Sequence, residues 1–186
     1  MSLTHGFSLP EVLISVAIGS TLMLSTVKLL PALQLAVLRQ TQDVAVQEDL
    51  WQLALLVGKH LQRAGYCAGN CRGDGLVLSR EGQCVISRWD ANNNGSWDTS
   101  SAEPEQTGFR LREGALEISR GTASCNGNGW EKISEPALFT VTRFEVSQRL
   151  VKGYAPRFVI ALEGVSARFG ETPRTVMHQV TGYNLP

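Results

Sequence analysis

The chain has 186 residues, of which 43% are hydrophobic, and its 17 basic residues balance 17 acidic ones. Proteins that bind nucleic acid through a charged surface carry a net basic domain, so this balance does not indicate nucleic acid as a partner. The length suits one soluble domain of ordinary size beside a membrane segment.

The N-terminal segment carries the strongest pattern. Between Phe7 and Lys28 the only charged side chain is Glu11, and the apolar run 12–27 approaches the roughly 20 residues that a helix needs to cross a bilayer. A carboxylate inside such a helix costs about 2.5 to 3.5 kcal/mol, so Glu11 should have a partner. We expect a membrane helix at residues 7–30. An uncleaved signal anchor or a secretory signal peptide is the alternative, although the first five residues include no Lys or Arg.

The residues Gly6-Phe7-Ser8-Leu9-Pro10-Glu11 resemble the N-terminus of type IV prepilins and type II secretion pseudopilins. In that family a membrane peptidase cuts after the glycine and methylates the new amine. The resemblance implies that residues 1–6 are a leader peptide and that Phe7 is the N-methylated first residue of the mature chain. It also implies an assembly role, in which the Phe7 amine of one subunit neutralises the Glu11 carboxylate of its neighbour.

The helix is expected to continue beyond the membrane. Apolar residues recur at spacings of three and four between Val46 and Ala64, which predicts one buried helical stripe. Pro31 predicts a kink, and a separate core helix after a break there is the alternative. Gly65 stands where a helix C-cap is favoured. Residues 31–186 are therefore expected to form the domain outside the membrane, including the second half of this helix.

The rest of the chain reads as strands. Segments with β-branched or aromatic residues and partial alternation follow one another with no helical period between them. This pattern predicts an α+β, type IV pilin-like fold, in which a long N-terminal spine helix packs on one antiparallel sheet. The expected strands are 84–89, 109–112 and 115–118 as a hairpin around Glu113-Gly114, 139–151, 157–162 and 174–182.

Four cysteines, Cys67, Cys71, Cys84 and Cys125, follow the membrane segment. An even number of cysteines is compatible with two disulfides in an oxidising compartment such as the periplasm. Sequence leaves all three pairings open; we favour Cys67–Cys71 with Cys84–Cys125, because the first closes a tight loop and the second ties two strand regions. A zinc site competes, but no Cys-x-x-Cys pair occurs.

A second set of residues narrows the resemblance. The step Arg63-Ala64-Gly65-Tyr66, the cysteine layout and the sequence Trp-Asp-Ala-Asn at 89–92 are similar to the W-type minor pilins, which include the prepilin-peptidase-dependent B proteins of enterobacteria. The resemblance implies a single-pass inner-membrane protein with a periplasmic domain that primes or caps a type IV pilus and can enter it. The implied partners are other minor pilins, the major pilin, prepilin peptidase and the inner-membrane assembly platform. A J-type pseudopilin of type II secretion is the alternative.

Residues 90–98 form the one metal-like pattern. Asp90, Asn92, Asn94 and Asp98 place oxygen side chains as in the first part of an EF-hand loop, with Gly95 at the sharp turn, which would suit calcium. The usual Glu at the twelfth position is missing. The alternative is a strand connection with Asx-turns, which uses the same residue types. We expect no required cofactor, and calcium as an optional one.

Catalytic residues are sparse. His60 and His178 stand alone in the sequence, and there is no Gly-x-Ser-x-Gly elbow or phosphate-binding glycine loop. We therefore expect a non-enzymatic protein. A membrane-anchored periplasmic enzyme or binding module is the remaining alternative.

Overall fold

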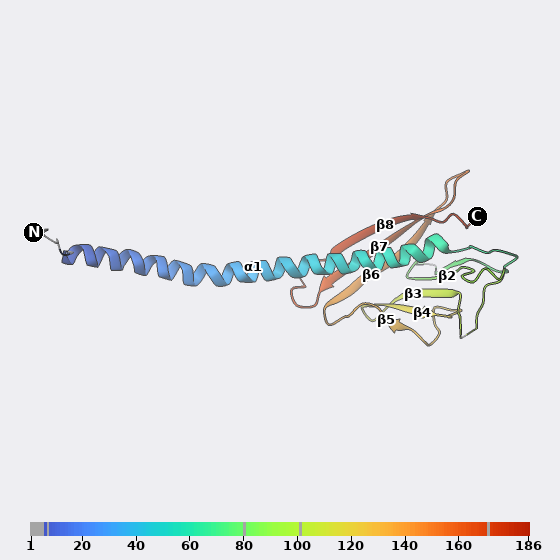
Figure 1. Cartoon of the computed structure of the whole chain (residues 1–186), viewed down its shortest axis with the longest axis horizontal. Coiled ribbons are helices and arrows are strands. Elements are labelled where there is room, and N and C mark those ends of the chain that lie inside the picture. The colour runs from blue at the N-terminus through green and yellow to red at the C-terminus, as the bar shows by residue number, and fades with distance from the viewer. Residues whose placement is uncertain (1–5, 7, 80, 101, 171) are drawn as a thin grey trace, which may run out of the picture. The chain divides into compact units, whose positions relative to one another are not determined.

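The structure is a computed structural model that describes residue 6 and residues 8–79, 81–100, 102–170 and 172–186. Its described part contains one helix followed by eight strands (Figure 1). The chain divides into two compact units, 1–41 and 42–186, so this boundary lies beyond the expected membrane boundary at residue 30. The elements are α1 (Leu9–Arg63), β1 (Leu76–Leu78), β2 (Cys84–Arg88), β3 (Gln106–Arg112), β4 (Ala115–Arg120), β5 (Glu131–Lys132), β6 (Phe139–Arg149), β7 (Arg157–Ser166) and β8 (Arg174–Thr181).

The first unit contains the beginning of α1. Its described side chains from Ser8 to Thr41 are all exposed, and α1 runs through Pro31. Hydroxyl groups along the helix bond to carbonyl oxygens one turn earlier, as Ser15 Oγ donates to the Glu11 carbonyl at 2.8 Å. By length and composition α1 is the one helix among the described residues that could cross a membrane, with a mean hydropathy of 1.8.

The second unit contains two antiparallel sheets. Five strands lie in the order β1-β2-β3-β4-β5, and three lie in the order β6-β7-β8. The expected helix and antiparallel strands are confirmed, whereas the expectation of a single sheet is wrong. The strands that sequence reasoning missed, β1 and β5, have three and two residues, which is too short to show alternation.

Hydrogen bonds at two turns join the sheets. The Val141 N–H of β6 donates to the Gly114 carbonyl in the β3–β4 turn at 2.9 Å, and the Val146 N–H donates to Gly82 at 2.9 Å. At Gly82 φ is +66°, and a Cβ there would lie 2.5 Å from the Val146 carbonyl oxygen. This close approach requires glycine, because any larger residue would push β6 away from the first sheet.

The predicted helical stripe forms the centre of the core. Figure 1 shows the C-terminal part of α1 running along the strands of the second unit, and its apolar side chains pack against both sheets. Gly58 permits the close contact with β8, because a Cβ at this position would lie 2.8 Å from the His178 ring. The buried core includes Val46, Leu50, Leu53, Val57 and Leu61 of α1 with Phe109, Phe144, Phe158, Ile160 and Leu162 of the strands.

Candidate processing and assembly site

Two residues of the segment 6–11, Ser8 and Glu11, cap the N-terminus of α1. The backbone N–H and the Oγ of Ser8 both donate to Oε2 of Glu11, each at 3.0 Å. The Ser8 carbonyl accepts the first helical bond from Val12 N–H at 3.3 Å. Ser8 is thus the N-cap and Glu11 returns to its N–H, as in a capping box. Sequence reasoning missed this role, although the Ser-x-x-Glu spacing signals it.

The neighbouring residues suit this helix start. Pro10 is the second residue of α1, where an N–H would have no helical partner, so its missing donor costs nothing. Gly6 is exposed, and a Cβ added to it would meet no atom within 4 Å. Phe7 lies outside the described residues. The structure therefore places Gly6 and Ser8 just before α1 and Pro10 and Glu11 in its first turn, and all four residues are exposed.

Glu11 is surrounded along α1 by exposed apolar side chains. Leu9 is 78% exposed, and Leu13 is 63% exposed. Helical residues of this composition are stable in a bilayer or against other apolar helices. The hydrogen bonds from Ser8 satisfy one carboxylate oxygen but do not neutralise the charge, so the need for a cationic partner persists.

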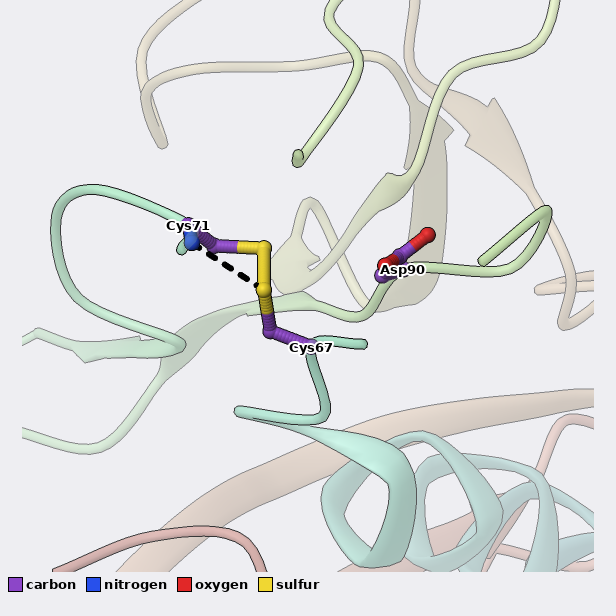
Figure 2. A group of neighbouring side chains, drawn as sticks. All are labelled: Cys67, Cys71 and Asp90. Carbon is purple, nitrogen blue, oxygen red and sulfur yellow. Dashed lines mark hydrogen bonds between the residues drawn. A yellow bond between two sulfur atoms is a disulfide. The ribbon is translucent and has the colours of Figure 1, made fainter. Parts of the chain in front are cut away.

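A second cluster lies just beyond the end of α1 (Figure 2). Cys67 and Cys71 are joined in a disulfide, and the Cys71 N–H donates to Cys67 Sγ at 3.0 Å. Oxygen and sulfur atoms of Asp90 and these cysteines lie within 4.8 Å of one another. Because the two sulfurs are bonded to each other, they are not thiolate ligands for a metal.

Two buried carboxylates organise the loop that carries the calcium-like pattern. Asp90 is 1% exposed and Glu105 is 2% exposed. Asp90 accepts three backbone N–H groups and Glu105 accepts three more, which satisfies these carboxylates without a cation. The donors are Ala68, Asn94 and Gly95 to Asp90, and Ala91, Asn92 and Asp98 to Glu105.

The remaining residues of the pattern bond to one another. The Asp98 carboxylate accepts the side-chain amides of Asn92 at 3.1 Å and Asn94 at 2.7 Å, and these bonds lower the pKa of Asp98. The Asn94 N–H also donates to Asn92 Oδ1 at 2.9 Å, as in an Asx-turn. For calcium to bind, the asparagine oxygens would have to turn towards Asp98, so calcium stays a prediction for experiment.

The long disulfide fastens a loop to the first sheet. Cys84 begins β2 and is bonded to Cys125, so the structure has the two pairs that the sequence favoured. Arg110 holds the same loop: it forms a buried ion pair with Glu117 at 2.7 Å and donates to the Cys125 carbonyl at 2.6 Å. The Arg110 guanidinium also lies 4.2 Å from the centre of the Trp130 ring.

His60 and His178, the two histidines among the described residues, have different neighbours. His60 lies edge-on to Trp89 and Phe109, with 5.1 Å between ring centres in each pair. Burial, with smaller effects from Arg63 and Arg120, lowers the pKa of His60 to about 4. A base with this pKa is weak near neutral pH. His178 instead packs on α1, with its ring centre 6.2 Å from that of Trp51.

Comparisons with known proteins agree with this geometry. The prokaryotic N-terminal methylation motif matches residues 1–27, and the family of prepilin peptidase-dependent protein B matches residues 39–182. Prepilin peptidase-dependent protein B of Escherichia coli K12 is 44% identical over 182 residues, covering 97% of both chains. A type IV-like pilin from Thermus thermophilus shares the fold with a TM-score of 0.52 at 14% identity, covering 76% of this chain and 98% of that one.

These findings confirm a pilin-like protein that depends on prepilin peptidase. The apolar helix and the methylation motif fit a membrane-anchored protein. The chain belongs to the family of prepilin peptidase-dependent protein B.

Proposed function

We propose that this chain is a minor pilin that is cut between Gly6 and Phe7 and then helps to prime or cap a type IV pilus. The family and the methylation motif support peptidase processing. The observation that carries the assembly role is Glu11, the only acidic residue between residues 8 and 27, in the first part of α1, where the side chains from Leu9 to Val27 are exposed and mostly apolar.

The assembly step follows from the position of this carboxylate. Cleavage after Gly6 would create an ammonium group on Phe7, one residue before Ser8. Ser8 donates both of its hydrogen bonds to Oε2 of Glu11. The Phe7 ammonium group of a neighbouring subunit can bond to the other carboxylate oxygen. Pairing the two charges lowers the cost of placing either one among apolar helices, so a subunit is most stable there beside a correctly aligned neighbour.

The proposed setting is the inner membrane, with the second unit in the periplasm and the subunit able to enter the pilus. Two disulfides, formed by the four cysteines of the chain, support an oxidising compartment. The proposed partners are prepilin peptidase, other minor pilins, the major pilin and the assembly platform of the membrane.

The test compares Glu11→Leu with Ser8→Ala in the full chain. Glu11→Leu removes the charge that is unfavourable in lipid, so membrane insertion and leader removal should continue. Its crosslinking to other minor pilins and the number of pili should fall, because a neighbour's ammonium loses its partner. Ser8→Ala removes only the hydroxyl bond to Glu11, so crosslinking to other minor pilins and the number of pili should stay as in the wild type.

Unchanged crosslinking and pilus number in Glu11→Leu would show that this residue has no assembly role. Mass spectrometry of proteins that co-purify from the envelope identifies the machine. Recovery of type II secretion components in place of pilus subunits would assign the chain to secretion.

A further inference from the structure

The hairpin loop between β6 and β7 exposes apolar and basic side chains together. Leu150 is 75% exposed, Val151 44% and Tyr154 77%. A Cβ on Gly153 would meet no atom within 4 Å, and Figure 1 shows the loop extending beyond the strands that it joins. Arg149, Lys152 and Arg157 are also exposed, and the segment contains no acidic residue. We call residues 149–157 the basic hairpin.

A small pocket with the opposite charge lies where β6 begins. Its volume is about 200 Å³, and both of the charged residues that line it are acidic, Asp49 on α1 and Glu135 before β6. Four apolar side chains, together with Gln52 and Ser134, complete its wall, and among the apolar ones Leu138 is 64% exposed. We call this the acidic pocket; its apolar lining residues are Leu53, Ile133, Leu138 and Phe139.

The two surfaces stand at opposite ends of one strand. Phe139 starts β6 and lines the acidic pocket, while Arg149 ends β6 and starts the basic hairpin. Eleven residues of strand separate them by about 35 Å, so they cannot meet within one molecule. The basic hairpin can therefore contact an acidic pocket of this kind only on another molecule.

We propose that the basic hairpin of one copy of this chain docks in the acidic pocket of a second copy. Tyrosine, leucine and arginine side chains would enter or surround a pocket that offers both apolar side chains and carboxylates, so apolar burial and charge attraction act together. The contact joins two different patches, and it therefore repeats from copy to copy without closing a pair.

The contact is small for a protein interface, so it is weak in free solution. The basic hairpin and the acidic pocket lie about 35 Å apart along β6, so docking requires two copies that are offset along their length. This inference uses the second unit alone and does not depend on the role proposed for Glu11. The failure of either proposal leaves the other standing.

Cysteine trapping with the detergent-solubilised full chain, in which two copies are free to shift along their length, tests the contact. The four native cysteines are all in disulfides, so an added cysteine supplies the free thiol. Two differently tagged copies, one with Tyr154→Cys and one with Leu138→Cys, should form a mixed disulfide dimer on oxidation. Met177→Cys replaces Leu138→Cys in the control, because Met177 is equally exposed at 64% but lies on β8.

Charge exchange adds a second measurement. Lys152→Glu in one copy should lower the yield of the mixed dimer by roughly three- to tenfold, because attraction becomes repulsion. Asp49→Lys in the other copy should restore it. If Asp49→Lys does not fold, Glu135→Lys takes its place. A Tyr154→Cys dimer with itself, equal trapping by Met177→Cys, no mixed dimer, or no restoration would each overturn the proposal.

Discussion

The two parts of α1 form the same secondary structure in different surroundings. Leu22 in the first unit is 63% exposed, whereas Leu50 in the second is fully buried. In the second part, apolar residues recur every three or four positions with polar residues between them, which suits one packed face. In the first part, Glu11 is the only charged residue before Lys28 and apolar residues occur on every side of the helix, so no single face can bury them. The spacing of the apolar residues, rather than helix formation itself, therefore distinguishes the part of α1 that packs in the protein core from the part suited to a membrane or to another protein.

Polar contacts differ in the same way. In the first unit the described side-chain bonds are local, such as that of Ser15 to the carbonyl one turn earlier. At the start of the second unit, Asp43 pairs with Arg174 at 2.5 Å, and Ser166 donates to Gln42 at 3.4 Å. These bonds join residues more than 120 positions apart. Folding of the second unit therefore depends on distant contacts within the chain, whereas the first unit needs only a suitable apolar environment.

Truncating a leucine in each part should give the largest difference. Leu50→Ala should lower the free energy of unfolding of the second unit by about 2 to 5 kcal/mol, because it leaves a cavity in the core. Leu22→Ala, at an exposed position, should change it by less than about 0.5 kcal/mol. Denaturant unfolding of the detergent-solubilised chain, followed by tryptophan fluorescence, measures both. Equal effects would contradict the distinction between the two parts of α1.

The two disulfides should contribute unequally to the second unit. The Cys84–Cys125 bond spans 41 positions and should add about 4 kcal/mol by loop entropy, whereas Cys67–Cys71 spans 4 and should add about 2 kcal/mol. Replacing each pair by serine and comparing the unfolding midpoints checks this order. A larger loss from the short bond would mean that the loop around Asp90 contributes more than chain entropy predicts.

His60, in the second part of α1, should make the stability of the second unit depend on pH. Its pKa in the folded protein is about 4, whereas the ordinary value is 6.5, so the unfolded chain takes up the proton first as the pH falls. The folded state is most stable above pH 6.5, and it loses on the order of 3 kcal/mol as the pH falls to 4. Unfolding of wild type and His60→Gln at pH 7.5 and 4.5 measures it. A difference between them that does not change with pH would contradict this.

Calcium should have the smallest effect. Millimolar calcium should raise the melting temperature of the wild type by a few degrees, as expected for about 1 kcal/mol, and Asp98→Ala should abolish the shift. Asp98 is the better target because Asp90 accepts three backbone N–H groups and its loss would destabilise the loop by itself. The absence of a shift in the wild type would favour the Asx-turn alternative.

Sequence patterns predicted the longest features best. The end of α1 near Ala64 and the hairpin at Glu113-Gly114 follow from local periodicity and turn chemistry, and the structure has both. The division into two sheets was not predictable in this way. The two sheets meet through backbone bonds from Val141 and Val146 to residues far along the chain, and such contacts leave no local pattern.

The candidate sites show the same limit. The motif from Gly6 to Glu11 could be recognised because all its residues are adjacent. The role of Glu105 was missed because it accepts backbone N–H groups up to 14 positions away, a contact that only the folded loop creates. The capping role of Ser8 was local and could have been found from its spacing to Glu11.

The intact mass of the protein from cells with an active prepilin peptidase tests the central claim most directly. The predicted mass is that of a chain beginning at Phe7 with one methyl group on its amine and two disulfides. Gly6→Val should retain the leader, whereas Gly19→Ala, within α1, should be processed normally. A wild-type mass that includes Met1 in cells with active peptidase would contradict the account.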